Sequence, residues 1–296
     1  MSNNNDDADI GLVAKAGLSE LDLAEIANLA QQCQQDDGFA VKLNWEMLKG
    51  RKPNQISDFF YYLDGQLVGY APLDSFGSKF ELTGLVLPSY RRRGIFRKLF
   101  SAAQAAIHQR QAQELLLVSY GASAAGKAVA QALHAPYKIS EYRMELDVTT
   151  TKVPPLPEIT LTLALVQEAE LDELAQLLIV SFGEGGGPDK ADLQRDLASL
   201  NSQYFLAKLG STTIGQLGVL KENQHSIYIR GVGILPAYRR QGYGRQLLAA
   251  TLTKMLEAGF QHFALDVETA NADALKLYQS CGFSETNVYE YYQAPF

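Results

Sequence analysis

The sequence predicts two tandem α/β domains, each built on a mixed β-sheet. The segment "LPSYRRRGIFRKLF" (87–100) returns as "LPAYRRQGYGRQLL" (235–248), half of the 296-residue chain further on. Repetition at a fixed spacing indicates two copies of one structural plan. Around each copy, helix-like and strand-like segments follow one another in the same order. Such interleaving is typical of a sheet covered by helices.

Each half opens with an amphipathic helix and continues with a hairpin. Apolar residues recur at helical spacing in 19–33, with Ser19 placed as an N-cap, and again in 169–182. The hairpins are predicted to turn at Asp64-Gly65 and near Gly210-Ser211, because these residues favour tight turns between strands.

The rest of each half repeats the same alternation of strand and helix. A strand ending in Leu-Pro leads into the arginine-rich repeat and then a helix, expected in the second half from about Gly244 to Ala258. Apolar strands follow at 114–120 and 262–268, and each half closes with a helix and an aromatic strand. Each half therefore supplies enough elements for its own sheet.

A proline-rich segment separates the two halves. The stretch "DVTTTKVPPLPEIT" (147–160) holds three prolines within four residues, which forbids a helix and favours an extended spacer. We therefore expect a first domain at 1–147, a linker at 148–158 and a second domain at 159–296.

Composition excludes several classes of protein. With 47% hydrophobic and 20% charged residues, the chain is typical of soluble globular proteins. The net charge of −7 argues against nucleic acid and anionic membranes as partners. Cys33 and Cys281 stand far apart, which argues against a disulfide framework or a metal site and suits the reducing cytoplasm. No apolar run is long enough to span a membrane.

The second arginine-rich segment has the features of an anion-binding turn. A strand reaches Pro236, and Gly242 and Gly244 then let backbone N–H groups approach a ligand closely. Because a helix begins here, its unpaired N–H groups and positive dipole end favour a pyrophosphate. Arginine side chains add positive charge around the turn: Arg239, Arg240 and Arg245. The alternative is an ordinary solvated helix start, and repetition in the same strand-to-helix context argues against it.

These motifs resemble those of the GNAT superfamily of N-acetyltransferases. The pattern R-x-x-G-x-G at 239–244, preceded by "GVGILPAY", is similar to the acyl-CoA pyrophosphate loop of that family. The block "VETANADALKLYQSCGF" (267–283) matches the next family motif of strand, Asn, helix, Leu-Tyr and Gly-Phe. The resemblance covers most of the second half and implies two GNAT-like domains.

The resemblance implies a role for individual residues. Acetyl-CoA is the implied donor, a primary amine of a small molecule or peptide the acceptor, and no metal takes part. Tyr278 would donate a proton to the departing thiolate, unless it only packs in the core, and Asn271 would contact the cofactor, cap a helix, or do both. A backbone N–H of the strand would stabilise the oxyanion. The remaining cofactor-binding residues are Val232, Gly233 and Ile234 along the pantetheine arm, and Arg239, Arg240, Gln241, Gly242, Tyr243, Gly244 and Arg245 around the pyrophosphate.

The sequence offers several candidates for the general base. His225, Tyr228 and Arg230 lie on the strand before the turn, and Glu184 lies in the glycine-rich loop "SFGEGGGPDK". Tyr228 and Arg230 share a face of the strand and are expected to line the acceptor side together. A base acting through water, or none, is an equal alternative.

The first half resembles a degenerate copy. Phe96 replaces the second glycine of its turn, no Asn stands at the later site, and alanine and valine replace Leu-Tyr. Glu81 is either a base or a structural carboxylate, and Trp45 is expected to pack in the core. We expect the second half to carry catalysis by direct transfer, without an acyl-cysteine, because Cys281 is placed for packing.

Three other interpretations fit the same motifs. One is a tandem acetyltransferase similar to mycothiol synthase, acting on a Cys- or sugar-containing amine. A second is an acyl-CoA-binding sensor without turnover. A third is acetylation of a charged tRNA or a ribosomal protein; the acidic balance argues against a bare nucleic-acid partner but leaves a protein amine open. The acceptor loops carry no code for a particular amine, and the sequence is compatible with a monomer or a homodimer.

Overall fold

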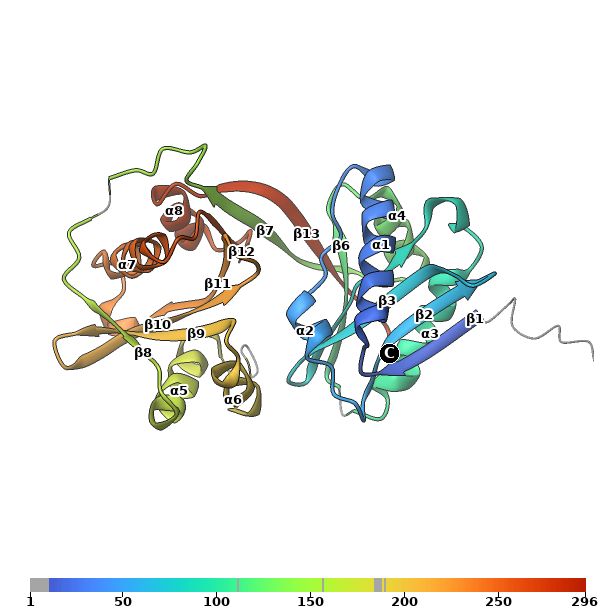
Figure 1. The fold of residues 1–296 in the computed structure, drawn as a ribbon, viewed down its shortest axis with the longest axis horizontal. Coiled ribbons are helices and arrows are strands. Elements are labelled where there is room, and N and C mark those ends of the chain that lie inside the picture. Colours follow the sequence, from blue (N-terminus) through green and yellow to red (C-terminus); the bar gives the residue numbers. More distant parts are fainter. Residues whose placement is uncertain (1–10, 111, 156, 184–187, 189) are drawn as a thin grey trace, which may run out of the picture. The chain divides into compact units, whose positions relative to one another are not determined.

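The chain folds into two compact units. In the computed structural model, residues 11–110, 112–155, 157–183, 188 and 190–296 are described. The N-terminal unit holds the residues up to Ile139 together with Tyr289–Phe296, and the C-terminal unit holds Ser140–Val288. Figure 1 shows their helices and strands with the labels used below.

The N-terminal unit contains a mixed sheet with the order β1-β2-β3-β4-β6-β13, and β5 lies beside β3. Strand β6 runs parallel to β4, whereas the other pairs along this order are antiparallel. Its elements are β1 (Gly11–Ala16), α1 (Glu20–Asp37), α2 (Trp45–Lys49), β2 (Ile56–Leu63), β3 (Gln66–Phe76), β4 (Lys79–Leu82), β5 (Leu85–Val86), η1 (Pro88–Tyr90), α3 (Ile95–Ile107), β6 (Glu114–Tyr120), α4 (Ala124–Ala132) and the end of β13 (Ser284–Gln293).

The C-terminal unit repeats this plan with the order β7-β12-β11-β10-β9-β8. Here β11 and β12 are the parallel pair. Its elements are most of β7 (Tyr137–Asp147), then β8 (Thr162–Leu165), η2 (Glu168–Glu170), α5 (Leu171–Phe182), α6 (Lys190–Ala198), β9 (Ser202–Leu209), β10 (Thr212–Lys221), β11 (Ser226–Ile234), η3 (Pro236–Tyr238), α7 (Tyr243–Glu257), β12 (His262–Glu268) and α8 (Ala272–Ser280). The prediction of tandem mixed α/β domains is confirmed.

The last strand of each half belongs to the sheet of the other half's unit. Strand β7 follows α4 in sequence, but its residues Glu141–Asp147 pair with β12. Strand β13 follows α8, but Tyr289–Gln293 pair with β6. The boundaries expected at 147 and 159 mark the repeat in the sequence, whereas the compact units have exchanged these two strands.

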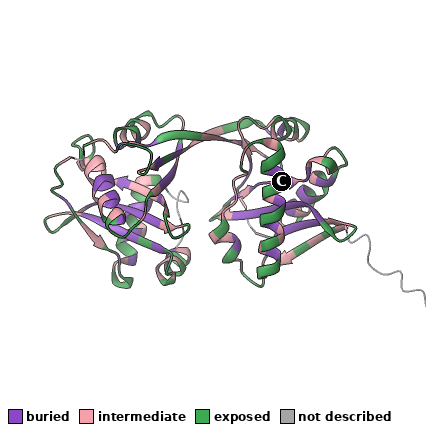
Figure 2. Cartoon of the chain, turned by 45° about the horizontal axis from the view of Figure 1, so that its top comes forward, coloured by how far each residue is buried: buried purple, intermediate pink, exposed green. Residues whose placement is uncertain are grey.

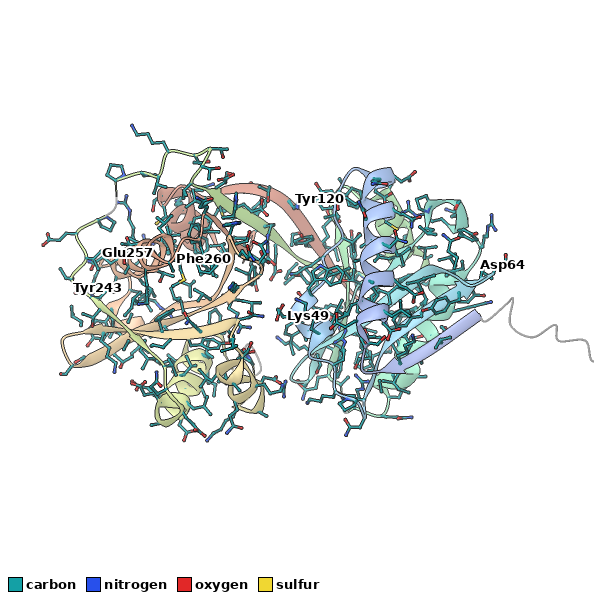
Figure 3. The ribbon with its side chains drawn as sticks, viewed as in Figure 1. Lys49, Asp64, Tyr120, Tyr243, Glu257 and Phe260 are labelled. Carbon is teal, nitrogen blue, oxygen red and sulfur yellow. The ribbon has the colours of Figure 1, made fainter. Side chains whose placement is uncertain are left out.

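Local sequence explains the predicted turns and helix starts. Asp64 and Gly65 both have positive φ, 49° and 74°, which matches the twist of the hairpin between β2 and β3; Asp64 is labelled in Figure 3. Gly210 likewise has φ 62° between β9 and β10. Ser19 caps α1, since its side chain accepts from the N–H of Asp22 while the Asp22 carboxylate accepts from the N–H of Ser19.

Period-two alternation divides the C-terminal unit into two apolar layers. Phe205 and Ala207 of β9 join the core that includes α7 and α8 residues, whereas Tyr204 and Leu206 join the core that includes α5 and α6 residues. The two helix pairs therefore cover opposite faces of the sheet. Figure 2 shows buried strands beside helices with exposed outer sides.

Core packing was expected for both Trp45 and Cys281, and the structure confirms it for only one of them. Trp45 begins α2 but is 36% exposed, so the expectation of core packing is wrong for this residue. Cys281 is buried against the α7–α8 core, as expected, and both described cysteines are free. No helix in the described part of the chain is long and apolar enough to cross a membrane.

Candidate active site

Strand β11 contains a β-bulge next to the arginine–glycine turn. Gly218 pairs with Arg230 and Gln216 with Gly233, so Gly231 and Val232 together face the single residue Leu217. Gly231 has φ +59°, a conformation that glycine adopts without strain. A bulge leaves its extra residue outside the ladder and turns its backbone groups away. The regular pairing between β10 and β11 is therefore interrupted at Gly231 and Val232.

The bulge lies where β11 and β12 separate. Their parallel pairing covers Ser226–Tyr228 and His262–Ala264. Beyond these residues β11 continues to Ile234 and β12 to Glu268 without a paired register between them in the described structure. The opening exposes the edge of Val232–Ile234, the segment expected to bind an extended ligand arm.

The turn after β11 has the geometry expected for an anion site. Arg240 and Gly242 take left-handed conformations, with φ 62° and 85°, and α7 begins at Tyr243 with no side chain capping it. Figure 3 labels Tyr243 and Glu257 at the two ends of this helix. A Cβ at Gly244 would lie 3.2 Å from Leu277 of α8, so the second glycine allows the two helices to approach. The uncapped N–H groups point to an anionic ligand.

The three arginines of this turn have different surroundings. Arg239 donates from Nε to the Ile234 carbonyl at 2.8 Å, and the described residues contain no ion-pair partner for it. Arg240 forms an exposed ion pair with Asp273 at 2.7 Å. Arg245 is directed away from the turn and donates to the carbonyls of Pro155 and Ser280, so the structure does not bring it to the other two.

The two remaining residues of the motif have local contacts. Gln241 donates from Nε2 to the Ala237 carbonyl at 3.0 Å, which ties the turn to η3. The Tyr243 ring packs edge-on against Tyr238, with centroids 6.4 Å apart. Both contacts hold the turn in place and leave its backbone N–H groups available.

The two motif residues on α8 are placed differently. Asn271 is the N-cap, and its Oδ1 accepts from the N–H of Ala274 at 3.1 Å. Tyr278 is 7% exposed and packs edge-on against Phe283 in the α7–α8 core. Burial, with a smaller effect of Cys281, raises the pKa of Tyr278 to about 12. Its phenol therefore keeps its proton at neutral pH and is a hydrogen-bond donor.

The structure separates the candidates for the general base. His225 precedes β11 and stands six residues before Gly231, about 20 Å along an extended strand, so it is too far from the bulge. Arg230 donates to Asp196 and Ser202, each at 2.7 Å, and stacks on Tyr204. Glu184 lies outside the described residues.

Tyr228 contacts a pair of charged residues that the sequence did not indicate. The Arg143 guanidinium lies 5.0 Å from the Tyr228 ring centroid and 3.6 Å from an oxygen of Asp266. Asp266 pairs with Arg143 in register and lies on β12 just beyond the last residue paired with β11. Because β7 belongs to the first half of the sequence, no local pattern places Arg143 here.

The N-terminal unit has a turn of similar backbone conformation with different side-chain contacts. Arg92 and Gly94 have φ 64° and 78°, close to their counterparts Arg240 and Gly242. Arg91, the counterpart of Arg239, donates twice to Asp37, at 2.7 and 2.6 Å. Its positive charge is therefore neutralised inside the unit.

Residues at two positions of the motifs are replaced in this unit. On α4, Ala130 stands at the repeat position of Tyr278, so no phenol is present there. The Phe96 ring covers Gly84, where a Cβ would lie 2.2 Å from the ring. The expectation of a missing proton donor in the first half is consistent with these positions.

A cavity of about 980 Å³ nevertheless opens in the N-terminal unit. Its wall runs from the end of α1 through the turn and β6 to α4, where small residues such as Ala125, Gly126 and Ala128 line it. Phe96, Arg92 and Arg97 also face it. The cavity is mostly apolar with basic residues in its wall, a lining suited to a ligand with an apolar body and an anionic end.

A strand bulge beside a separated parallel pair, leading into a phosphate-type turn, defines an acyl-transferring enzyme of the N-acetyltransferase class. Known proteins agree. The chain belongs to the acetyltransferase (GNAT) family, whose model matches residues 22–134 and again 171–283. The two matches confirm the tandem arrangement.

Three relatives define the similarity more closely. A mycothiol acetyltransferase of Thermomonospora curvata is 27% identical over 96% of this chain and 97% of its own length. The N-alpha-acetyltransferase RimI of Mycobacterium tuberculosis is 33% identical over 43% of this chain and 80% of its own. The crystal structure of a GCN5-related N-acetyltransferase from Sphaerobacter thermophilus matches with a TM-score of 0.75 at 19% identity, covering 96% of both chains; it supports the fold.

Among the described residues, no three His, Cys, Asp or Glu side chains come together to hold a metal ion. Sequence reasoning missed three further features near the bulge: the buried Gln216, its partner Ser181, and the Arg143–Asp266 pair. A buried Gln on a strand gives no periodic signal, because the surrounding pattern is apolar.

Proposed function

We propose that the C-terminal unit transfers an acetyl group from acetyl-CoA to a primary amine by direct attack in a ternary complex. The observation that carries this proposal is the separation of β11 from β12 beside the bulge at Gly231 and Val232, continuing into the uncapped start of α7. This combination offers a strand edge for an extended arm and N–H groups for a diphosphate.

Each part of the coenzyme has residues of matching chemistry. The backbone of Val232, Gly233 and Ile234 would pair with the amides of the pantetheine arm. The N–H groups at Gly242–Gly244 and the guanidinium of Arg239 would hold the diphosphate. The exposed Arg240 is free to exchange Asp273 for a phosphate oxygen, since an exposed ion pair contributes little.

The reaction needs few protein groups. The nitrogen lone pair of the neutral amine attacks the thioester carbonyl, and a backbone N–H of the bulge stabilises the oxyanion. The C–S bond then breaks, the thiolate receives a hydrogen bond and finally a proton at sulfur, and the amine loses one proton to water or a base. Because Tyr278 has a pKa of about 12, its phenol stabilises the thiolate mainly as a hydrogen-bond donor.

Two kinds of acceptor are supported by the relatives. The mycothiol acetyltransferase resembles this chain over both units, which favours a small-molecule amine of that type. The RimI relative resembles one unit at higher identity and favours a protein N-terminal amine instead. Whole-length similarity carries more weight here, because it includes the strands that the two halves exchange.

Release of free thiol from acetyl-CoA tests the proposal. The purified chain is assayed with a panel of aminothiols, amino sugars, amino acids, polyamines and short peptides. Amine-dependent thiol release supports the transferase, and the best amine identifies the acceptor class. Binding of acetyl-CoA without thiol release from any amine would instead establish the alternative, an acyl-CoA sensor.

A further inference from the structure

A buried amide lies against the bulge. Gln216 of β10 is 0% exposed, and its Nε2 donates to Ser181 Oγ of α5 at 2.9 Å and lies 3.5 Å from the Gly231 carbonyl. Its Oε1 is buried and has no hydrogen-bond partner among the described residues. A buried carbonyl oxygen that accepts no hydrogen bond is rare in folded proteins, so a bound ligand is a candidate donor for it.

Two glycines of β11 make room for this amide. A Cβ at Gly233 would lie 2.4 Å from both Gln216 Nε2 and Ser181 Oγ, and a Cβ at Gly231 would lie 3.3 Å from Leu178 of α5. The missing side chains allow Gln216 to reach from β10 across β11. The amide therefore lies on the α5 face of the strand whose other edge has separated from β12.

The N-terminal unit shows that the fold does not require this arrangement. Gly69-Tyr70 of β3 repeats Gly215-Gln216 at the same distance from the hairpin turn. The Tyr70 hydroxyl donates to Asp58 at 2.6 Å. Thr83 and Leu85 stand at the positions of Gly231 and Gly233. The glycine pair and the amide thus occur together in the unit that keeps the other features of the site.

We propose that Gln216 is an acceptor-positioning residue: its Oε1 accepts a hydrogen bond from the N–H of the attacking amine. This inference rests on the proposed function of the C-terminal unit. The Nε2 group, held by Ser181 and the Gly231 carbonyl, fixes the direction of Oε1. A neutral amide suits this task because, unlike a carboxylate, it does not favour the unreactive ammonium form of the acceptor.

Steady-state kinetics with the best amine of the panel test the inference. Gln216→Met removes the oxygen at similar volume, and Gln216→Glu keeps an acceptor oxygen while losing the donor. We expect Met to raise the KM for the amine about tenfold or more, the effect of one lost hydrogen bond. Glu should also raise the KM for the amine, because it loses the donor that orients the oxygen and its carboxylate favours the ammonium form. The KM for acetyl-CoA should change less than twofold in both variants.

A matched control uses the same chemical change at an exposed site. Gln203 lies on the neighbouring strand β9 and is exposed, so Gln203→Met should leave both KM values unchanged. Circular dichroism and thermal melting report whether the variants fold. If Gln216→Met fails to fold, Ser181→Ala decides, because it loosens the amide and should raise the amine KM alone.

The possible results distinguish a failure of the Gln216 proposal from a failure of the proposed acetyltransferase function. Wild-type thiol release with an unchanged amine KM in Gln216→Met overturns the inference and leaves the transferase standing. A matching rise in the KM for acetyl-CoA assigns Gln216 a structural role and also overturns the inference. No thiol release by wild type with any amine removes both.

Discussion

Arg91 and Asp37 form an ion pair with two hydrogen bonds, of 2.7 and 2.6 Å, and this pair distinguishes two turns of similar backbone conformation. Arg239 occupies the same place in the C-terminal unit without an acidic partner among the described residues. A guanidinium already bound to a carboxylate has little left to offer a phosphate. The two corresponding arginines therefore differ in their contacts.

This difference predicts opposite effects of the same substitution. Arg239→Ala should raise the KM for acetyl-CoA about tenfold, since it removes a charge-assisted hydrogen bond to the diphosphate. Arg91→Ala should leave that KM within about twofold and instead lower the melting temperature, because Asp37 loses its partner. Thiol release at varied acetyl-CoA concentration measures the KM of both variants, and thermal melting measures their stability. Equal KM effects would place the coenzyme in both turns.

The proposed role of Tyr278 can be tested through turnover and pH. Tyr278→Phe should lower kcat about 100-fold while the KM for acetyl-CoA stays nearly constant, because the phenol acts on the departing thiolate. Since burial raises the pKa of Tyr278 to about 12, wild-type kcat should show no loss from its ionisation up to about pH 10. Unchanged kcat in the Phe variant would remove Tyr278 from the mechanism.

Much of the site could be predicted from the sequence because its parts are local. The turn at 239–244, the start of α7 and the cap at Asn271 depend on neighbouring residues, and the structure has each in place. Ser19 and the Asp64-Gly65 turn were predictable for the same reason.

The remaining features depend on pairing between distant strands. The bulge at Gly231 is a register shift against β10, and Gln216 is buried only because glycines stand opposite it. Nothing in the aromatic pattern of β7 or β13 specifies which sheet each strand joins. For this reason the exchange of strands and the position of Arg143 next to Asp266 were not predictable.

A side chain added at Gly84 should clash with the Phe96 ring, and removing the ring should relieve the clash. Gly84→Ala places a Cβ about 2.2 Å from the Phe96 ring, so it should destabilise the protein by about 1–3 kcal/mol. Adding Phe96→Ala should remove that penalty, giving a coupling of at least about 1 kcal/mol in a double-mutant cycle measured by urea unfolding. Additive effects of the two changes would show that the ring does not rest on Gly84.

Acid stability should depend on Asp22. Burial raises the pKa of this carboxyl, but hydrogen bonds and the charge of Lys15 together with Ser19 outweigh it, and the net pKa lies below the ordinary 3.8. A lowered folded pKa gives stability that is present above the unfolded pKa and is lost as pH falls through the folded one. Unfolding free energies of wild type and Asp22→Asn should differ by a constant amount from pH 7 to 5 and converge below about pH 4. A constant difference at all pH values would contradict the shift.

The exchanged strands predict that a residue near the carboxyl terminus stabilises the N-terminal unit. Tyr291 is 1% exposed, packs with Leu116 and Val118 of β6, and accepts a hydrogen bond from Lys42 at 2.6 Å. Tyr291→Ala should therefore cost about 3–5 kcal/mol in that unit. Hydrogen exchange followed by mass spectrometry should show faster exchange in β6 and unchanged exchange in β11 and β12.

A substitution at Phe283 should affect hydrogen exchange in the C-terminal unit instead. Phe283 stands eight residues earlier in the sequence but is buried in the α7–α8 core of the C-terminal unit. Phe283→Ala should accelerate exchange in β12 and spare β6, because stability losses stay within the cooperative unit that loses the contact. If Tyr291→Ala accelerated hydrogen exchange in β12 and not in β6, the last strand would belong to the unit of its own half. The two units would then not share strands in this way in solution. The two substitutions give opposite hydrogen-exchange patterns only if the chain crosses from the C-terminal unit to the N-terminal unit between Phe283 and Tyr291.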